Sequence, residues 1–174
     1  AAVKRGVKPV VGVDLLIAEP GERAEPSLLT LLCIDEPGYR NITRLVSRAY
    51  IEGQQQGRPL GDRSWLTADS LGGLIALSGG GAGDVARAAL AGREDEAQRL
   101  LEQWVGWMPG RFYLEVSRVG RPDEERWIDW ALEAAAPEVE APPYRARVGL
   151  AEPRPASGRL RRVSRVAVPL PVVE

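Results

Sequence analysis

Few side chains in this 174-residue sequence are able to do acid–base, nucleophilic or metal chemistry. Histidine is absent, and Cys33 is the single cysteine. A His-based catalytic triad, a His-ligated metal, a disulfide and a thiolate zinc cluster are therefore all excluded within this chain. Leu31, Leu32 and Ile34 flank the cysteine, so we predict that Cys33 is a small buried hydrophobic residue rather than a nucleophile.

Two carboxylates, Asp14 and Glu115, lie at or near the ends of expected strands. In a parallel barrel the strand ends line the active site. Two carboxylates without a third ligand form only a weak site for a divalent cation, and Glu115 has the simpler alternative of pairing with an arginine.

The glycine-rich segment GGGAGD, residues 79–84, lies between an expected strand and an expected helix. Backbone N–H groups in such a turn are able to bind phosphate. The glycines do not match the GxGxxG register and no Gly-Lys-Ser/Thr follows, so we favour a tight turn that needs glycine dihedral angles. The run RLRRVSR, 159–165, is interpreted as a solvated basic stretch, and the five tryptophans as core or partner-facing residues.

Apolar patterning predicts an α/β fold. Short apolar runs rich in β-branched residues predict four strands, over 7–18, 28–34, 73–78 and 111–117. Apolar residues at helical spacing predict helices over 38–53, 84–92, 97–108 and 122–136, with Asp84 as an N-cap and a short turn or helix at 65–71. Because helices separate most of these strands, we expect mainly parallel strands with flanking helices.

The pattern changes at Pro137. Residues 137–174 contain seven Arg and four Glu, a net charge of +3, while the whole chain carries −1 and residues 1–136 therefore carry −4. Seven of the 14 prolines also lie in this segment. We expect residues 137–174 to be an irregular or disordered tail. No apolar run approaches 18 residues, so no transmembrane helix is expected.

The order of the motifs resembles a known family. The segments KPVVGVD (8–14), LTLLCIDEPGYRNITRLVSRAYIEG (29–53), GGLIALSGGGAGDVARAALAG (72–92) and RFYLEVSRVGRPDEE (111–125) are similar to the polymerase-and-histidinol-phosphatase (PHP) domain of the bacterial DNA polymerase III alpha subunit. The resemblance covers about residues 3–136 and is strongest to the proteobacterial branch. It implies a partial (βα) PHP-type barrel over 1–136, as a truncated fragment. A shifted reading frame after Ala136 would account for the tail.

The resemblance also locates the positions of the family's metal ligands. A Glu after the first strand corresponds to Asp14, and a His that opens the next strand corresponds to Leu28. The Cys or His of the LSG turn corresponds to Gly80, and the His after FYLE corresponds to Val119. One of the four positions keeps a ligand type, so the resemblance implies a metal-degenerate PHP domain with no retained catalytic, metal or cofactor site.

The family relationship implies a cytoplasmic role in DNA replication. The full-length subunit would be a DNA-directed DNA polymerase, a nucleotidyltransferase that uses Mg²⁺ and carries its catalytic carboxylates in a palm domain outside this chain. The segment itself would be an inactive scaffold that docks the proofreading exonuclease subunit, with other holoenzyme subunits as further partners. It would meet DNA only through the full-length subunit and would not contact membrane. The alternatives are a stand-alone PHP metal phosphoesterase and a non-catalytic interaction module.

Overall fold

The computed structural model describes residues 3–6, 9–19, 25–135 and 165–169. Four strands form in the apolar runs where the sequence predicts them: β1 (Gly12–Ala18), β2 (Ser27–Cys33), β6 (Leu74–Leu77) and β7 (Phe112–Ser117). Two further strands, β5 (Gly61–Asp62) and β8 (Arg165–Pro169), complete a sheet in the order β5-β1-β2-β6-β7-β8. A separate short hairpin pairs β3 (Gln54–Gln55) with β4 (Arg58–Pro59).

The strand directions in this sheet are mixed. The pairs β1–β5 and β6–β7 are parallel, whereas β1–β2, β2–β6 and β7–β8 are antiparallel. Followed across the sheet, these pairings orient β5, β1, β6 and β7 in one direction and β2 and β8 in the other. Most strands thus share one direction, as the sequence predicts, although neighbouring pairs are more often antiparallel. Only the short stretch 19–26 separates β1 from β2, and it has no room for the helical crossover that parallel neighbours need.

The expectation of an irregular tail over 137–174 is wrong for residues 165–169. These residues form β8, which pairs with β7 from Ser117 opposite Arg165 to Tyr113 opposite Pro169. The β-branched residues of RVAVP suit a strand, and Pro169 ends it at a sheet edge, where a missing N–H is tolerated. The rest of the expected tail lies outside the described residues.

Four α-helices correspond to the helical patterns of the sequence. They are α1 (Glu36–Ile51), α2 (Asp84–Leu90), α3 (Glu94–Trp107) and α4 (Glu124–Ala134). The helix α1 begins earlier than expected because the Asp35 side chain accepts a hydrogen bond of 2.8 Å from the backbone N–H of Gly38. The predicted short element at 65–71 consists of a 3₁₀ turn, Arg63–Trp65, followed by hydrogen-bonded turns. No helix among the described residues is long and apolar enough to cross a bilayer.

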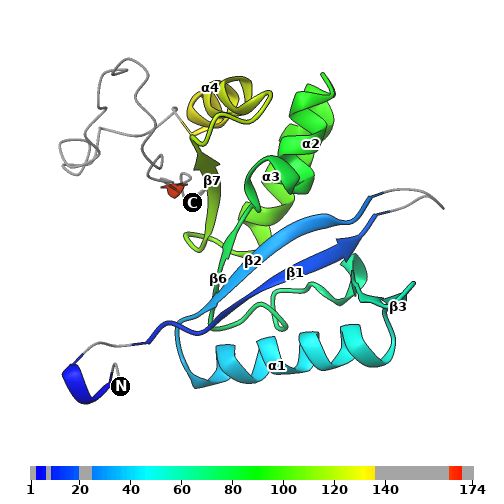
Figure 1. The fold of residues 1–174 in the computed structure, drawn as a ribbon, viewed down its shortest axis with the longest axis vertical. Helices are drawn as coiled ribbons and strands as arrows, with labels where there is room; N and C mark the ends of the chain where they lie inside the picture. Colours follow the sequence, from blue (N-terminus) through cyan, green and yellow to red (C-terminus); the bar gives the residue numbers. More distant parts are fainter. Residues whose placement is uncertain (1–2, 7–8, 20–24, 136–164, 170–174) are drawn as a thin grey trace.

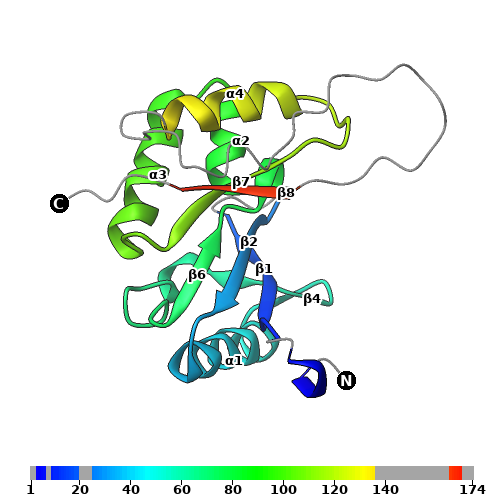
Figure 2. The ribbon, with the colours of Figure 1, turned by 90° about the vertical axis from the view of Figure 1, so that its left-hand side faces the viewer.

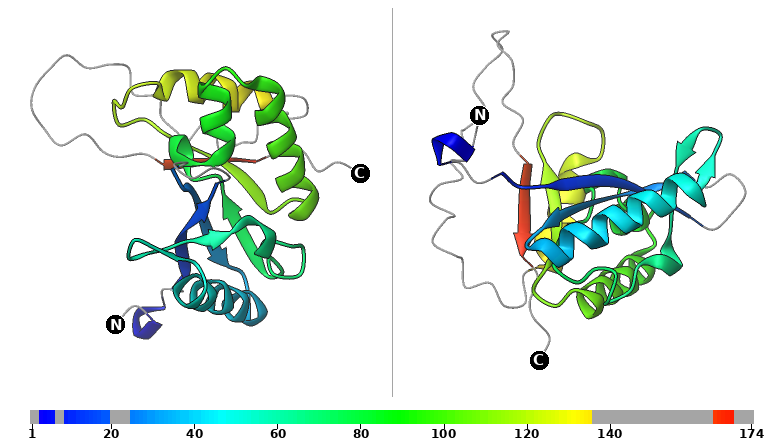
Figure 3. Two further views of the ribbon diagram at one scale, coloured as in Figure 1. Left: turned by 90° about the vertical axis from the view of Figure 1, so that its right-hand side faces the viewer. Right: turned by 90° about the horizontal axis from the view of Figure 1, so that it is seen from below.

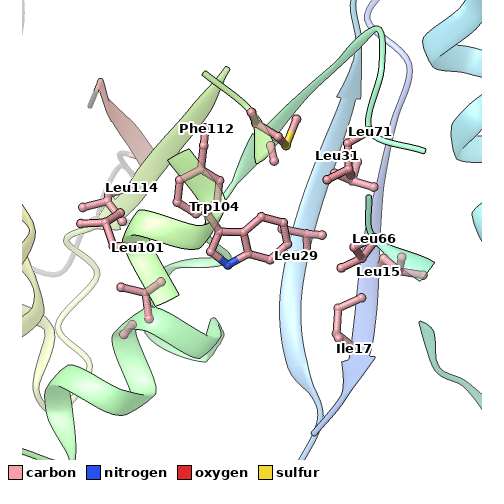
Figure 4. Packing of buried hydrophobic residues seen from close by; sticks show 14 of the residues in the cluster. Leu15, Ile17, Leu29, Leu31, Leu66, Leu71, Leu101, Trp104, Phe112 and Leu114 are labelled. Carbon is pink, nitrogen blue, oxygen red and sulfur yellow. The ribbon is translucent and has the colours of Figure 1, made fainter. Parts of the chain in front are cut away.

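All four helices pack against one face of the sheet. Side chains from every helix share a single hydrophobic core with Leu15, Leu29 and Leu31 of β1 and β2. Trp104 of α3 is central to this core and stacks on Phe112 with ring centroids 5.2 Å apart (Figure 4). Figures 1 and 2 show α1 beside one half of the curved sheet and α2, α3 and α4 beside the other. This arrangement is consistent with a partial (βα) barrel whose helices lie outside.

Candidate metal site on the helix-free sheet face

The face of the sheet opposite the helices carries three of the positions that the sequence singles out, Asp14, Leu28 and Glu115. Side chains alternate between the two faces of a strand, and in each of these strands one of the two alternating sets of side chains packs into the core. The other set defines what we call the helix-free face: Asp14 and Leu16 of β1, Leu28, Thr30 and Leu32 of β2, Ile75 and Leu77 of β6, and Tyr113 and Glu115 of β7. The left panel of Figure 3 shows how β1, β2 and β6 lie together, with α1 on one side of them.

Asp14 and Leu28 are close neighbours on this face. Asp14 lies opposite Thr30 in the β1–β2 register, and Leu28 is the next residue of β2 on the same face. The Thr30 hydroxyl donates a hydrogen bond of 2.6 Å to Oδ1 of Asp14. Asp14, the one carboxylate among the four predicted ligand positions, is exposed and has a hydrogen-bond partner in the neighbouring strand.

Gly80 is brought to the same end of β2 by the glycine turn that follows β6. Gly79 and Gly80 both have positive φ angles, +73° and +55°. A Cβ atom on Gly79 would lie 2.1 Å from the carbonyl oxygen of Leu28, so the turn packs directly against β2. Gly83 is equally constrained, since its Cβ would lie 1.6 Å from the Ser78 carbonyl oxygen. These contacts support the prediction that 79–84 is a tight turn.

Asp84 does not have the predicted N-cap role. Gly83 caps α2, and Asp84 is the first residue of the helix. One carboxylate oxygen of Asp84 accepts from the Val85 N–H at 2.7 Å, and the other points toward the core. The difference arises because Asp84 pairs with residues far away in the sequence, as described below.

Val119 lies in the loop between β7 and α4, held by Glu124. The backbone N–H groups of Val119, Gly120 and Arg121 donate to Oε2 of Glu124 at 2.9, 2.6 and 2.9 Å. Desolvation acts to raise the pKa of Glu124, but these three hydrogen bonds outweigh it and lower the pKa below its ordinary value. Val119 thus contributes a backbone N–H to a structured loop and has no side-chain donor for a metal.

Glu115 is buried at the join between β7, the glycine turn and α4. Its backbone N–H donates to the Ser78 hydroxyl at 2.9 Å, and its carbonyl oxygen accepts from the Trp127 indole N–H at 2.9 Å. The carbonyl oxygen also lies 3.7 Å from the position of a Cβ on Gly80. The structure therefore brings Leu28, Gly80 and Glu115 to one region, and Asp14 lies next to Leu28 on the strand pair.

Comparison with known proteins identifies the family. The model of the PHP domain family matches residues 1–119, about two thirds of the chain. This chain belongs to the PHP domain family. It is 41% identical over 130 residues to a protein of Vibrio cholerae and 42% identical over 134 residues to one of Pasteurella multocida. A protein of Escherichia coli K12 is 39% identical over 130 residues.

Each of these relatives is named DNA polymerase III subunit alpha. The matches cover 75 to 77% of this chain and 11% of the length of each relative. The similarity therefore relates this PHP domain to one region of a much longer protein.

The donor set of this PHP domain does not fit a metal cluster. Leu28, Gly80 and Val119 have no side-chain atom that is able to coordinate a metal, and Asp14 supplies one carboxylate. Among the residues that the structure describes, no group of three or more Cys, Asp or Glu side chains is placed to hold a metal ion. Zn²⁺ and similar borderline metals favour imidazole or thiolate ligands, which these positions lack.

An ion-pair cluster that sequence reasoning missed lies on the helix side of the sheet. Arg63 Nη2 donates to Asp84 Oδ2 at 2.5 Å and to Glu19 Oε1 at 3.2 Å. Burial acts to lower the pKa of Arg63, but the two carboxylates outweigh it and raise the pKa above its ordinary value. The Trp104 indole N–H shares the same Asp84 oxygen. These residues are widely separated in sequence, so no local pattern could have revealed the cluster.

Two surface hollows lie away from the ligand positions. One, of about 470 Å³, is lined by residues that include Arg63, Thr67 and Trp107, and the other, of about 440 Å³, lies at the start of α3. None of Asp14, Leu28, Gly80 and Val119 lines either hollow.

Proposed function

We propose that this PHP domain is a metal-free scaffold within a DNA polymerase III alpha subunit. The single observation that carries the proposal is the lack of a coordinating side-chain atom at Leu28, Gly80 and Val119, three of the predicted ligand positions, on a domain that is 37 to 42% identical to polymerase III alpha subunits. The full-length subunit performs template-directed transfer of deoxynucleotides with Mg²⁺ in the cytoplasm, through a palm domain outside this chain.

The scaffold role is supported by how the four ligand positions are used. Asp14 is tied to Thr30, Gly80 supplies a positive φ angle, and the N–H of Val119 helps to hold the β7–α4 loop. Asp14, Gly80 and Val119 thus contribute to the fold, and none of the four positions supplies an imidazole or thiolate for metal-activated water. This chain alone therefore has neither phosphoesterase nor polymerase activity.

The partners of the scaffold are the other subunits of the polymerase III holoenzyme, among them the proofreading exonuclease subunit. The name of the relatives supports membership of a multi-subunit enzyme. The domain docks the exonuclease through a protein surface, since residues 1–136 carry a net charge of −4 and are poorly suited to gripping DNA themselves.

Metal content and hydrolysis test the metal-free assignment. The purified chain is dialysed with Zn²⁺ or Mn²⁺, analysed for bound metal, and assayed with a phosphomonoester substrate. We expect no stoichiometric metal and no hydrolysis. The double variant Leu28→His/Val119→His is the matched comparison. It keeps Asp14 and places an imidazole at two of the predicted ligand positions. One tightly bound metal per unmodified chain would contradict the proposal and favour a stand-alone phosphoesterase.

Exonuclease docking needs a separate measurement. The full-length alpha subunit and this chain are each mixed with the proofreading exonuclease subunit and analysed by sedimentation velocity. We expect a one-to-one complex in both mixtures. A complex with the full-length subunit alone would show that the docking surface lies outside this chain.

A further inference from the structure

We draw no further inference here: the strongest candidate, the surface hollow of about 470 Å³ between the 3₁₀ turn that begins at Arg63 and the end of α3, rests on an open, partly apolar surface around Trp107, and nothing in the structure shows what covers it.

Discussion

The Trp104 indole Nε1 lies 2.9 Å from Oδ2 of Asp84 and donates a hydrogen bond to it. Trp104 is 2% exposed, so its polar N–H is buried and needs this acceptor. The same oxygen accepts from Arg63 Nη2. Asp84 thus joins the glycine turn, the 3₁₀ turn that begins at Arg63, and the centre of the core.

We predict that Asp84→Asn destabilises the domain by about 2–3 kcal/mol. The Asn amide lacks the negative charge with which Asp84 compensates the largely buried guanidinium of Arg63. Removing one partner of a buried ion pair costs more free energy than an exposed ion pair contributes. Urea denaturation monitored by tryptophan fluorescence measures the change. Asp69→Asn, in an exposed turn, is the matched control and should change stability by less than about 0.5 kcal/mol. Equal stability of the two variants would contradict the structural role of Asp84.

We predict that Gly83→Ala disrupts the turn before α2, whereas Gly81→Ala does not. A Cβ on Gly83 would lie 1.6 Å from the Ser78 carbonyl oxygen, and that backbone is fixed between β6 and β7. Gly81 has open space around its Cβ position and no positive φ angle. We expect Gly83→Ala to cost about 2–4 kcal/mol in unfolding free energy and Gly81→Ala less than about 0.5 kcal/mol. Thermal denaturation of both variants measures this difference in stability. Similar denaturation midpoints would contradict the turn geometry.

The elements that depend on local pattern were predictable from the sequence. The apolar runs of β1, β2, β6 and β7 and the spacing of the four helices identify them, and the buried Trp104 and Trp127 match the predicted core role. The family resemblance supplied the barrel architecture, which patterning leaves open.

The remaining features depend on contacts between distant parts of the chain. β5 has two residues and exists only through its pairing with β1, and β8 follows a long segment without apolar period. The Arg63–Asp84 ion pair joins the 3₁₀ turn that begins at Arg63 to the first residue of α2, and in the sequence alone Asp84 resembles an ordinary helix cap. Such tertiary contacts leave no periodic signal in one sequence.

We predict that Glu124→Gln loosens the β7–α4 loop and that acid does the same to the unmodified chain. The carboxylate has a lowered pKa because it accepts three backbone N–H groups, although desolvation opposes the shift. A depressed folded pKa means that the stabilisation is complete at neutral pH and is lost as the pH falls through the folded value. Hydrogen exchange at Val119 and Gly120 should accelerate in the variant at pH 7. Glu125→Gln removes only an exposed ion pair with Arg118 and should leave these amides protected.

We predict weak, salt-sensitive binding of this chain to DNA. Residues 1–136 carry a net charge of −4, and the +3 of residues 137–174 is the main basic contribution. Affinity for DNA depends on the number of phosphates that cationic side chains neutralise, and each contact steepens the dependence on salt. We therefore expect fluorescence anisotropy with primed DNA to show binding no tighter than about 10⁻⁶ M at physiological salt. Removing residues 137–174 should abolish even this binding. Tighter binding that survives the deletion would mean that the barrel region itself grips DNA, and that its role extends beyond a protein scaffold.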